Sequence, residues 1–178
     1  MKLRMRLWHW AHRKLITLEA ALRDGEERAG SIRVQTATGW DIPNDREGEI
    51  QSGNESEHSD LARKHPNATF YAELSREYNC HGLTFASRRT RIGEQYALHR
   101  IVGEEYREIK VVEAKTGDVV MYWDDGEVTH SGIVVSQPTP LGELRVWSKW
   151  GSLSEVLHHY LDVPPIYGGT PKFYRRLA

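Results

Sequence analysis

Residues 117–137 read GDVVMYWDDGEVTHSGIVVSQ, and this stretch decides the fold class. It contains two β-rich runs, GDVVMYW (117–123) and VTHSGIVVSQ (128–137), on either side of Asp125-Gly126. An Asp-Gly pair between two such runs is a strong signal for a tight hairpin turn, because both residues accept the backbone angles that the turn requires. The stretch therefore predicts two antiparallel strands joined by a hairpin.

The regions around the hairpin complete this prediction. A third strand is expected downstream at 143–151, which reads ELRVWSKWG. Upstream, a helix is expected to start at or next to Cys80 and to run to about Thr90, with Leu83 and Ala86 facing inward. An antiparallel meander that follows a helix is typical of an α+β domain.

The first 60 residues differ in character from the rest, and we divide the chain into an accessory region, 1–60, and a compact domain, 61–178. SIRVQT (31–36) predicts a short strand, and the polar stretch 39–60 predicts a long loop. An amphipathic N-terminal helix is expected to pack on the domain or a protein partner, with an anionic membrane as the less favoured alternative. Its apolar positions recur at steps of three and four: Leu3, Leu7, Ala11, Leu15, Leu18 and Leu22.

The composition excludes several functional classes. The 178 residues suit one domain with an appended arm, and 24 basic against 25 acidic residues give no support for nucleic-acid binding. A single cysteine cannot form an internal disulfide. We find no signal-peptide core and no run of about 20 apolar residues for a membrane span. The expected protein is therefore soluble and cytoplasmic, although export by a dedicated system stays open.

The only cysteine, Cys80, lies in the sequence EYNCHGLTFA (77–86). Asn79 is a good N-cap residue, so the thiol is expected at a helix start, where unpaired backbone N–H groups favour thiolate and can bind an oxyanion. The alternative is an ordinary buried small side chain, which is the commoner role of a lone cysteine.

Two downstream residues are candidate partners for that thiol. His130 lies within an otherwise apolar or hydroxylic strand and is a candidate general base. In the third strand, Val146 and Ser148 share one face while Lys149 lies on the other. The apolar face is expected to pack on the helix, so Ser148, rather than Lys149, is expected to orient the imidazole. If the strand ends differently, Lys149, His158 or His159 replaces it.

Three segments resemble a known family. Asn79-Cys80-His81-Gly82-Leu83 looks like the DCSGL signature of NlpC-type papain-like cysteine peptidases, and GDVV…HSGIV (117–134) looks like their GDLVFF…HVGIY segment. VWSKWG (146–151) resembles the KNSWG segment of papain-type proteases. The resemblance covers about residues 70–151. It implies a papain-like α+β fold, in which the nucleophile helix packs on a small antiparallel sheet.

The resemblance also implies a function. It gives a Cys/His thiol hydrolase that cleaves an amide bond in a peptide or peptidoglycan-type substrate through an acyl-enzyme, without a cofactor. By this comparison Cys80 is the nucleophile, His130 the general base and Ser148 the orienting residue. The family's Asp and Ser around the nucleophile are Asn79 and His81 here. His81 is then a substrate-facing group or a second base.

Other interpretations stay open. Trp150 either lines a substrate cleft or packs in an aromatic core. Tyr71 and Tyr78 are the candidates for a side-chain oxyanion donor. An acyltransferase or deamidase, or a catalytically inactive binding module of the same fold, would carry the same motifs. The nine histidines show no metal-ligand spacing, so no metal site is expected.

Overall fold

The computed structural model describes residues 30–46, 54–71, 74–137, 143–150 and 154–178. The expected N-terminal amphipathic helix lies outside these residues. Within the described part, none of the helices combines the length and the apolar character that crossing a membrane would require.

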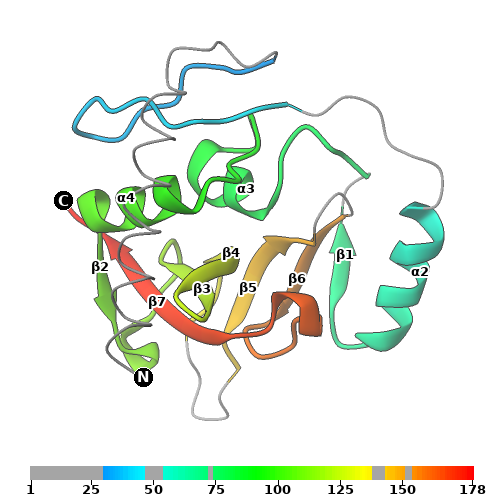
Figure 1. Cartoon of the computed structure of the whole chain (residues 1–178). Coiled ribbons are helices and arrows are strands. Elements are labelled where there is room, and N and C mark those ends of the chain that lie inside the picture. Colours follow the sequence, from blue (N-terminus) through cyan, green and yellow to red (C-terminus); the bar gives the residue numbers. More distant parts are fainter. Residues whose placement is uncertain (1–29, 47–53, 72–73, 138–142, 151–153) are drawn as a thin grey trace, which may run out of the picture.

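The structure is an α+β fold built on one seven-stranded sheet (Figure 1), as the sequence predicts at this level. The strand order is β1-β6-β5-β4-β3-β7-β2, and every neighbouring pair is antiparallel. The strands are β1 (Thr69–Tyr71), β2 (Tyr106–Ile109), β3 (Val119–Asp124), β4 (Glu127–Val134), β5 (Arg145–Lys149), β6 (Glu155–His159) and β7 (Thr170–Arg176). The helices are α2 (Asn54–Lys64), α3 (Cys80–Ala86) and α4 (Gln95–Glu105), with short 3-10 turns η1 (Val111–Glu113) and η2 (Pro165–Tyr167).

The predicted hairpin is confirmed as β3–β4. Its turn places Asp125 at φ 44° and Gly126 at φ 85°, the positive values that a tight hairpin requires and that Asp and Gly tolerate best. The third strand of the meander, β5, pairs with β4 as expected.

The helix α3 starts at Cys80, as predicted. The Asn79 side chain accepts a hydrogen bond of 2.8 Å from the backbone N–H of Gly82, which satisfies one of the unpaired donors of the first turn. Leu83 and Ala86 are buried, as expected. The helix ends four residues before Thr90, because Ser87 adopts a left-handed conformation with φ 51°.

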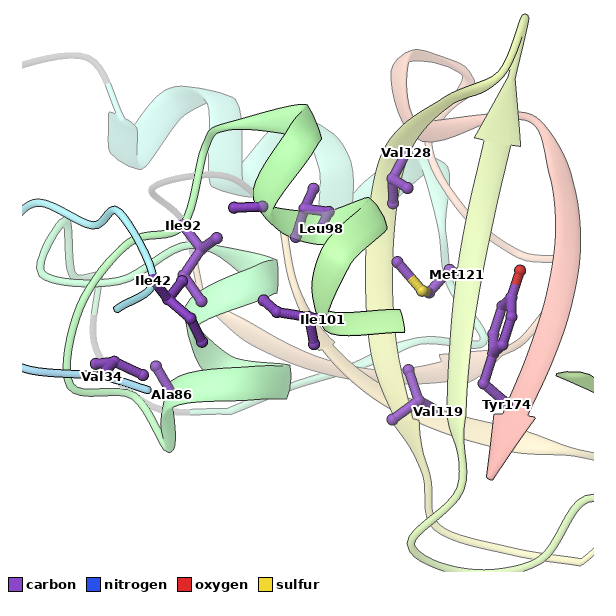
Figure 2. Close-up of a cluster of buried hydrophobic side chains, with 11 residues drawn as sticks. Val34, Ile42, Ala86, Ile92, Leu98, Ile101, Val119, Met121, Val128 and Tyr174 are labelled. Carbon is purple, nitrogen blue, oxygen red and sulfur yellow. The ribbon is translucent and has the colours of Figure 1, made fainter. Parts of the chain in front are cut away.

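One hydrophobic core lies between the helices and the sheet (Figure 2). Leu98 and Ile101 of α4 pack there with Val119 and Met121 of β3. Residues 30–46 of the expected accessory region take part, because Ile42 and Val34 belong to the same cluster. Figure 2 shows Ile42 and Val34 beside Ala86 and Ile92, on the side of the helices away from the strands.

A second hydrophobic core covers the opposite face of the sheet. Val120 and Tyr122 of β3 point into it, as do Val134 of β4, Val146 of β5 and Phe173 of β7. Successive residues of one strand thus enter different cores, and both faces of the central strands are buried.

Two predictions for the N-terminal third were wrong. The expected strand 31–36 is reduced to a single bridge between Gln35 and Asp41. The expected loop 39–60 contains the start of α2 (Asn54–Lys64), so the proposed boundary at residue 60 falls inside a helix. The polar sequence of α2 carries too little apolar periodicity to signal a helix.

Candidate functional site

Cys80 is buried at the first position of α3, with 6% of its surface exposed. Burial raises the pKa of its thiol to about 11. The expectation of a thiolate at neutral pH is therefore not met, because loss of solvent around the sulfur outweighs every favourable contact.

Four groups nevertheless act in favour of the charged form. The backbone N–H groups of Ser131, His81 and Cys80 itself lower the thiol pKa, as does the positive charge of Lys149. The surroundings of the sulfur are thus arranged to stabilise negative charge, even though the resting thiol keeps its proton.

His81 is part of the scaffold of α3 rather than a substrate-facing group. Its side chain is buried, and Nδ1 lies 2.8 Å from Ser131 Oγ. Ser131 Oγ donates in turn to Thr84 Oγ1 at 3.0 Å, and Thr84 donates to the Cys80 carbonyl at 2.9 Å. This chain assigns the proton to Nδ1 of His81. Burial lowers its pKa to about 4, so the ring is neutral near pH 7.

His130 is fully buried on β4, and neither ring nitrogen has a hydrogen-bond partner among the described residues. The expected Cys80–His130 hydrogen bond is therefore not formed. The ring stacks on Tyr167, with centroids 4.6 Å apart, and lies at 5.5 Å from the ring of Tyr122. Burial, followed by the charges of His158 and His81, lowers the pKa of His130 far below 6.5.

Ser148 does not contact His130. It is fully buried, and its hydroxyl lies 2.8 Å from His158 Nε2. His158 Nδ1 lies 2.8 Å from the carbonyl of His159, which assigns a proton to Nδ1 and makes Nε2 the acceptor of the Ser148 hydroxyl. The predicted orienting contact between His130 and Ser148 is thus replaced by a Ser148–His158 pair.

The strand register explains this difference. Gly132 pairs with Ser148 and Val134 with Val146, so Ser148 shares the face of the core that lies away from α3. Lys149 lies on the other face, where it pairs with Glu155. The expectation that Ser148, rather than Lys149, lies on the side of α3 was wrong. The apolar face of β5 does enter a core, but it is the core opposite the helix.

The remaining sequence candidates have structural roles. Asn79 is fully engaged, since its oxygen accepts from the N–H groups of Gly82 and Ile92 and its nitrogen donates to the Ile92 carbonyl. Trp150 is fully buried among aromatic rings, 4.8 Å from His65 and 5.4 Å from Phe70. The core interpretation of Trp150 is therefore the one that the structure supports.

Sequence analysis missed one residue of this region, Tyr167, and misplaced another. Tyr167, in the turn-rich C-terminal part, covers His130, and its pKa is raised by burial and, to a smaller extent, by negative charge on Cys80. Lys149 was placed on the wrong face. No local signal marks Tyr167, because the contact joins residues 37 positions apart.

Comparisons with known proteins add no relatives: no family model, no curated protein and no solved structure matches this chain. Among the described residues, no group of three or more His, Cys, Asp or Glu side chains has the arrangement of a metal site.

Proposed function

We propose that this protein is a thiol hydrolase that cleaves an amide bond, with Cys80 as the nucleophile and His130 as the proton acceptor. The observation that carries the proposal is the fully buried His130, whose two ring nitrogens have no partner among the described residues. An unsatisfied buried polar group costs about 1–3 kcal/mol, and such groups call for a reason. A role as proton acceptor during a reaction would explain why the nitrogens of His130 have no such partner.

The surroundings of the two groups support their cooperation. His130 directly precedes Ser131, whose backbone N–H acts on the Cys80 sulfur. Tyr167 stacks on His130, and its pKa is raised by burial and, to a smaller extent, by negative charge on Cys80, so the three side chains are neighbours. The imidazole stays neutral at pH 7 because burial lowers its pKa, so one ring nitrogen keeps a free lone pair, although the same burial weakens it as a base in the resting protein.

The reaction follows from these groups. The Cys80 sulfur attacks the amide carbonyl carbon while its proton passes to His130. The N–H groups of Cys80 and His81 hold the oxyanion. The C–N bond then breaks, the amine leaves with the proton from His130, and a thioester remains on Cys80. Water hydrolyses the thioester and restores the thiol. In the resting protein the thiol and the imidazole are not hydrogen-bonded, so substrate must bring them together.

The substrate class, a peptide or peptidoglycan-type amide, comes from the resemblance of residues 79–83, 117–134 and 146–151 to NlpC-type enzymes. The test is incubation with a panel of γ-D-glutamyl and ordinary peptides, followed by intact-mass analysis. We expect an acyl adduct on Cys80 and release of amine, both lost in Cys80→Ala. His130→Gln should slow both, whereas His99→Gln should not, because His99 packs on Trp123.

One observation favours a second candidate, a binding module that lacks catalysis. The thiol pKa of about 11 and the missing bond to His130 are what a retained fold without chemistry would show. Absence of both adduct and released amine across the panel, with peptide binding unchanged in Cys80→Ala, would establish this second candidate and refute the hydrolase. If an added amine captures the acyl group in place of water, the protein is the related acyltransferase.

A further inference from the structure

Lys149 is a lysine with no exposed surface, at the end of β5. The register places it one residue beyond the Gly132–Ser148 pair, at the level of Ser131 on β4. Ser131 faces α3, because its hydroxyl contacts His81 and Thr84, and Lys149 lies on this same face. The lysine side chain therefore enters the layer between the sheet and the start of α3.

The nearest acidic group, Glu155, is occupied by other donors. Its carboxylate accepts from Tyr78 Oη at 2.7 Å, Trp147 Nε1 at 2.5 Å, and both Nε and Nη2 of Arg88. A carboxylate offers about four acceptor positions, so these four donors fill them. Arg88 also supplies the compensating positive charge. Arg88 thus makes the direct ion pair with Glu155, while the charge of Glu155 also acts on Lys149.

The ammonium group of Lys149 lies over the ring of Tyr78, with Nζ 4.8 Å from its centroid. Tyr78 precedes Cys80 by two residues, which brings this charge beside the first turn of α3. Burial dominates both pKa values, and Glu155 acts on the lysine more than the thiol does; beside these effects the lysine charge lowers the pKa of the thiol, and a thiolate raises that of the lysine.

We propose that Lys149 is the residue that stabilises negative charge at Cys80, first on the thiolate and then on the oxyanion of the acyl-transfer step. This inference rests on the proposed role of Cys80 as nucleophile. Lys149 is then the polar side chain of β5 that acts on the thiol from the α3 side of the sheet, whereas Ser148 lies on the other side. A purely structural lysine, held for its contact with Tyr78, would not alter the chemistry of the sulfur.

The first test measures the rate of iodoacetamide reaction with Cys80 at pH 7.5. In Lys149→Met we expect the rate to fall about tenfold, which corresponds to a rise of about one unit in the thiol pKa. Lys149→Arg should keep the rate within about twofold of the original, because the charge remains. The matched control is Lys172→Met, since Lys172 also lies over a ring, that of Trp123, on β7. An unchanged or faster rate in Lys149→Met overturns the inference.

The second test uses the unmodified protein, so it does not depend on a variant that folds. Burial lowers the pKa of Lys149 to about 8. The lysine is charged below this pH and neutral above it, so its help to the thiolate is present below pH 8 and lost above. The logarithm of the alkylation rate should rise by one per pH unit up to about pH 8 and then bend to a shallower slope. A straight line from pH 6.5 to 10 contradicts the inference.

The other groups around Lys149 do not titrate in this range. The pKa of Glu155 is lowered and that of Arg88 is raised, so both keep their charges. The pKa of Tyr78 is about 12, and that of His81 is about 4. A bend near pH 8 therefore reports Lys149 itself.

The two proposals fail separately. If the alkylation rate depends on Lys149 but no peptide is cleaved, the proposed hydrolase function is wrong, and the proposed effect of Lys149 on Cys80 stands. If peptides are cleaved with Cys80 as nucleophile but the alkylation rate does not depend on Lys149, only the proposed effect of Lys149 on Cys80 is wrong.

Discussion

The two faces of strands β4 and β5 bury polar groups in opposite ways. The face toward α3 holds charged groups as well as the neutral His81: Glu155 binds Arg88, and Lys149 lies over Tyr78. On the opposite face, His130 and His158 are buried as neutral rings.

This difference indicates which face favours a negatively charged group and which favours a neutral base. A site lined with compensated charges and backbone N–H groups stabilises an anion, such as a thiolate or an oxyanion. A site that excludes water around uncharged imidazoles keeps a base unprotonated. The Cys80 sulfur lies by the backbone N–H of Ser131, the residue after His130, so the two kinds of surroundings adjoin at this point of β4.

Lowering the pH should have the largest effect on stability, because it favours protonation of the buried neutral histidines. The folded pKa of His158 is about 4 and that of His130 lies well below 6.5, whereas both titrate near 6.5 when unfolded. Between pH 6.5 and 4 the unfolded chain therefore binds more protons than the native protein does. The free energy of unfolding thus falls as the pH falls through this range. The expected slope is about 1.4 kcal/mol per pH unit for each such histidine. Urea denaturation at pH 7, 6 and 5 measures it.

His81 adds a third neutral imidazole on the face toward α3. Replacement of His158 by Gln should therefore reduce the slope by about one proton but not abolish it. A free energy of unfolding that stays constant between pH 7 and 5 would show that the histidines are not held neutral.

Replacement of Gly82 by Ala comes next, and it tests the face toward α3. A Cβ at Gly82 would lie 1.8 Å from the backbone carbonyl oxygen of Thr90, which cannot move without moving the loop after α3. We expect a loss of about 3 kcal/mol, the upper end for overpacking, measured by chemical denaturation. The control is Gly103→Ala in α4, where nothing lies within 4 Å. That change should stabilise by about 0.5–1 kcal/mol.

Replacement of Gly132 by Ala should have an intermediate effect and disturb both faces. The new methyl would meet Val146 Cγ1 at 2.5 Å and the Trp147 carbonyl oxygen at 2.9 Å, which forces β5 away from β4. The expected loss is about 2 kcal/mol. A matched change at Gly93, which has nothing within 4 Å, should cost little. Equal midpoints for the two variants in urea would contradict this packing argument.

The smallest effects compare two buried serines on opposite faces. Ser148→Ala removes the hydrogen bond to His158, and Ser131→Ala removes the bond to His81. Each should cost about 1 kcal/mol. Only Ser131→Ala should alter the rate of Cys80 alkylation, because it releases the chain that ties His81 and Thr84 to α3. A change of rate in Ser148→Ala instead would argue for the orienting role that the resemblance implies.

The parts of the fold that rest on local signals could be predicted. The turn at Asp125-Gly126 needs residues that tolerate positive φ, and the helix start needs a side-chain acceptor at Asn79. Both signals lie within a few residues of the feature they define. The helix α2 and the strand β7 carry no comparable signal: the sequence of α2 is polar, and β7 ends in arginines and is defined by its pairing with the distant strands β3 and β2.

The candidate site could be predicted only in part. The positions of Cys80 at the start of α3 and of His130 within β4 were predicted, but the absence of a hydrogen bond between them was not, since that depends on which way β4 faces. The placement of Ser148 failed for a definite reason. Alternation along β5 shows which residues share a face, but it cannot show which face meets the helix when both faces are buried. Lys149 makes the prediction harder, because lysine is ordinarily a surface residue and its face of β5 is therefore expected to be exposed.

The position of β7 has a consequence for biosynthesis. This strand follows the other six described strands in the chain, yet it lies between β3 and β2 in the sheet. Among the described strands, β2 pairs with β7 alone, so it has no neighbour until the C-terminal residues leave the ribosome. The nascent chain therefore carries an open edge on β3 for nearly 50 residues of synthesis, from Asp124 to Thr170. The seven-stranded sheet is therefore complete only after β7 has been made.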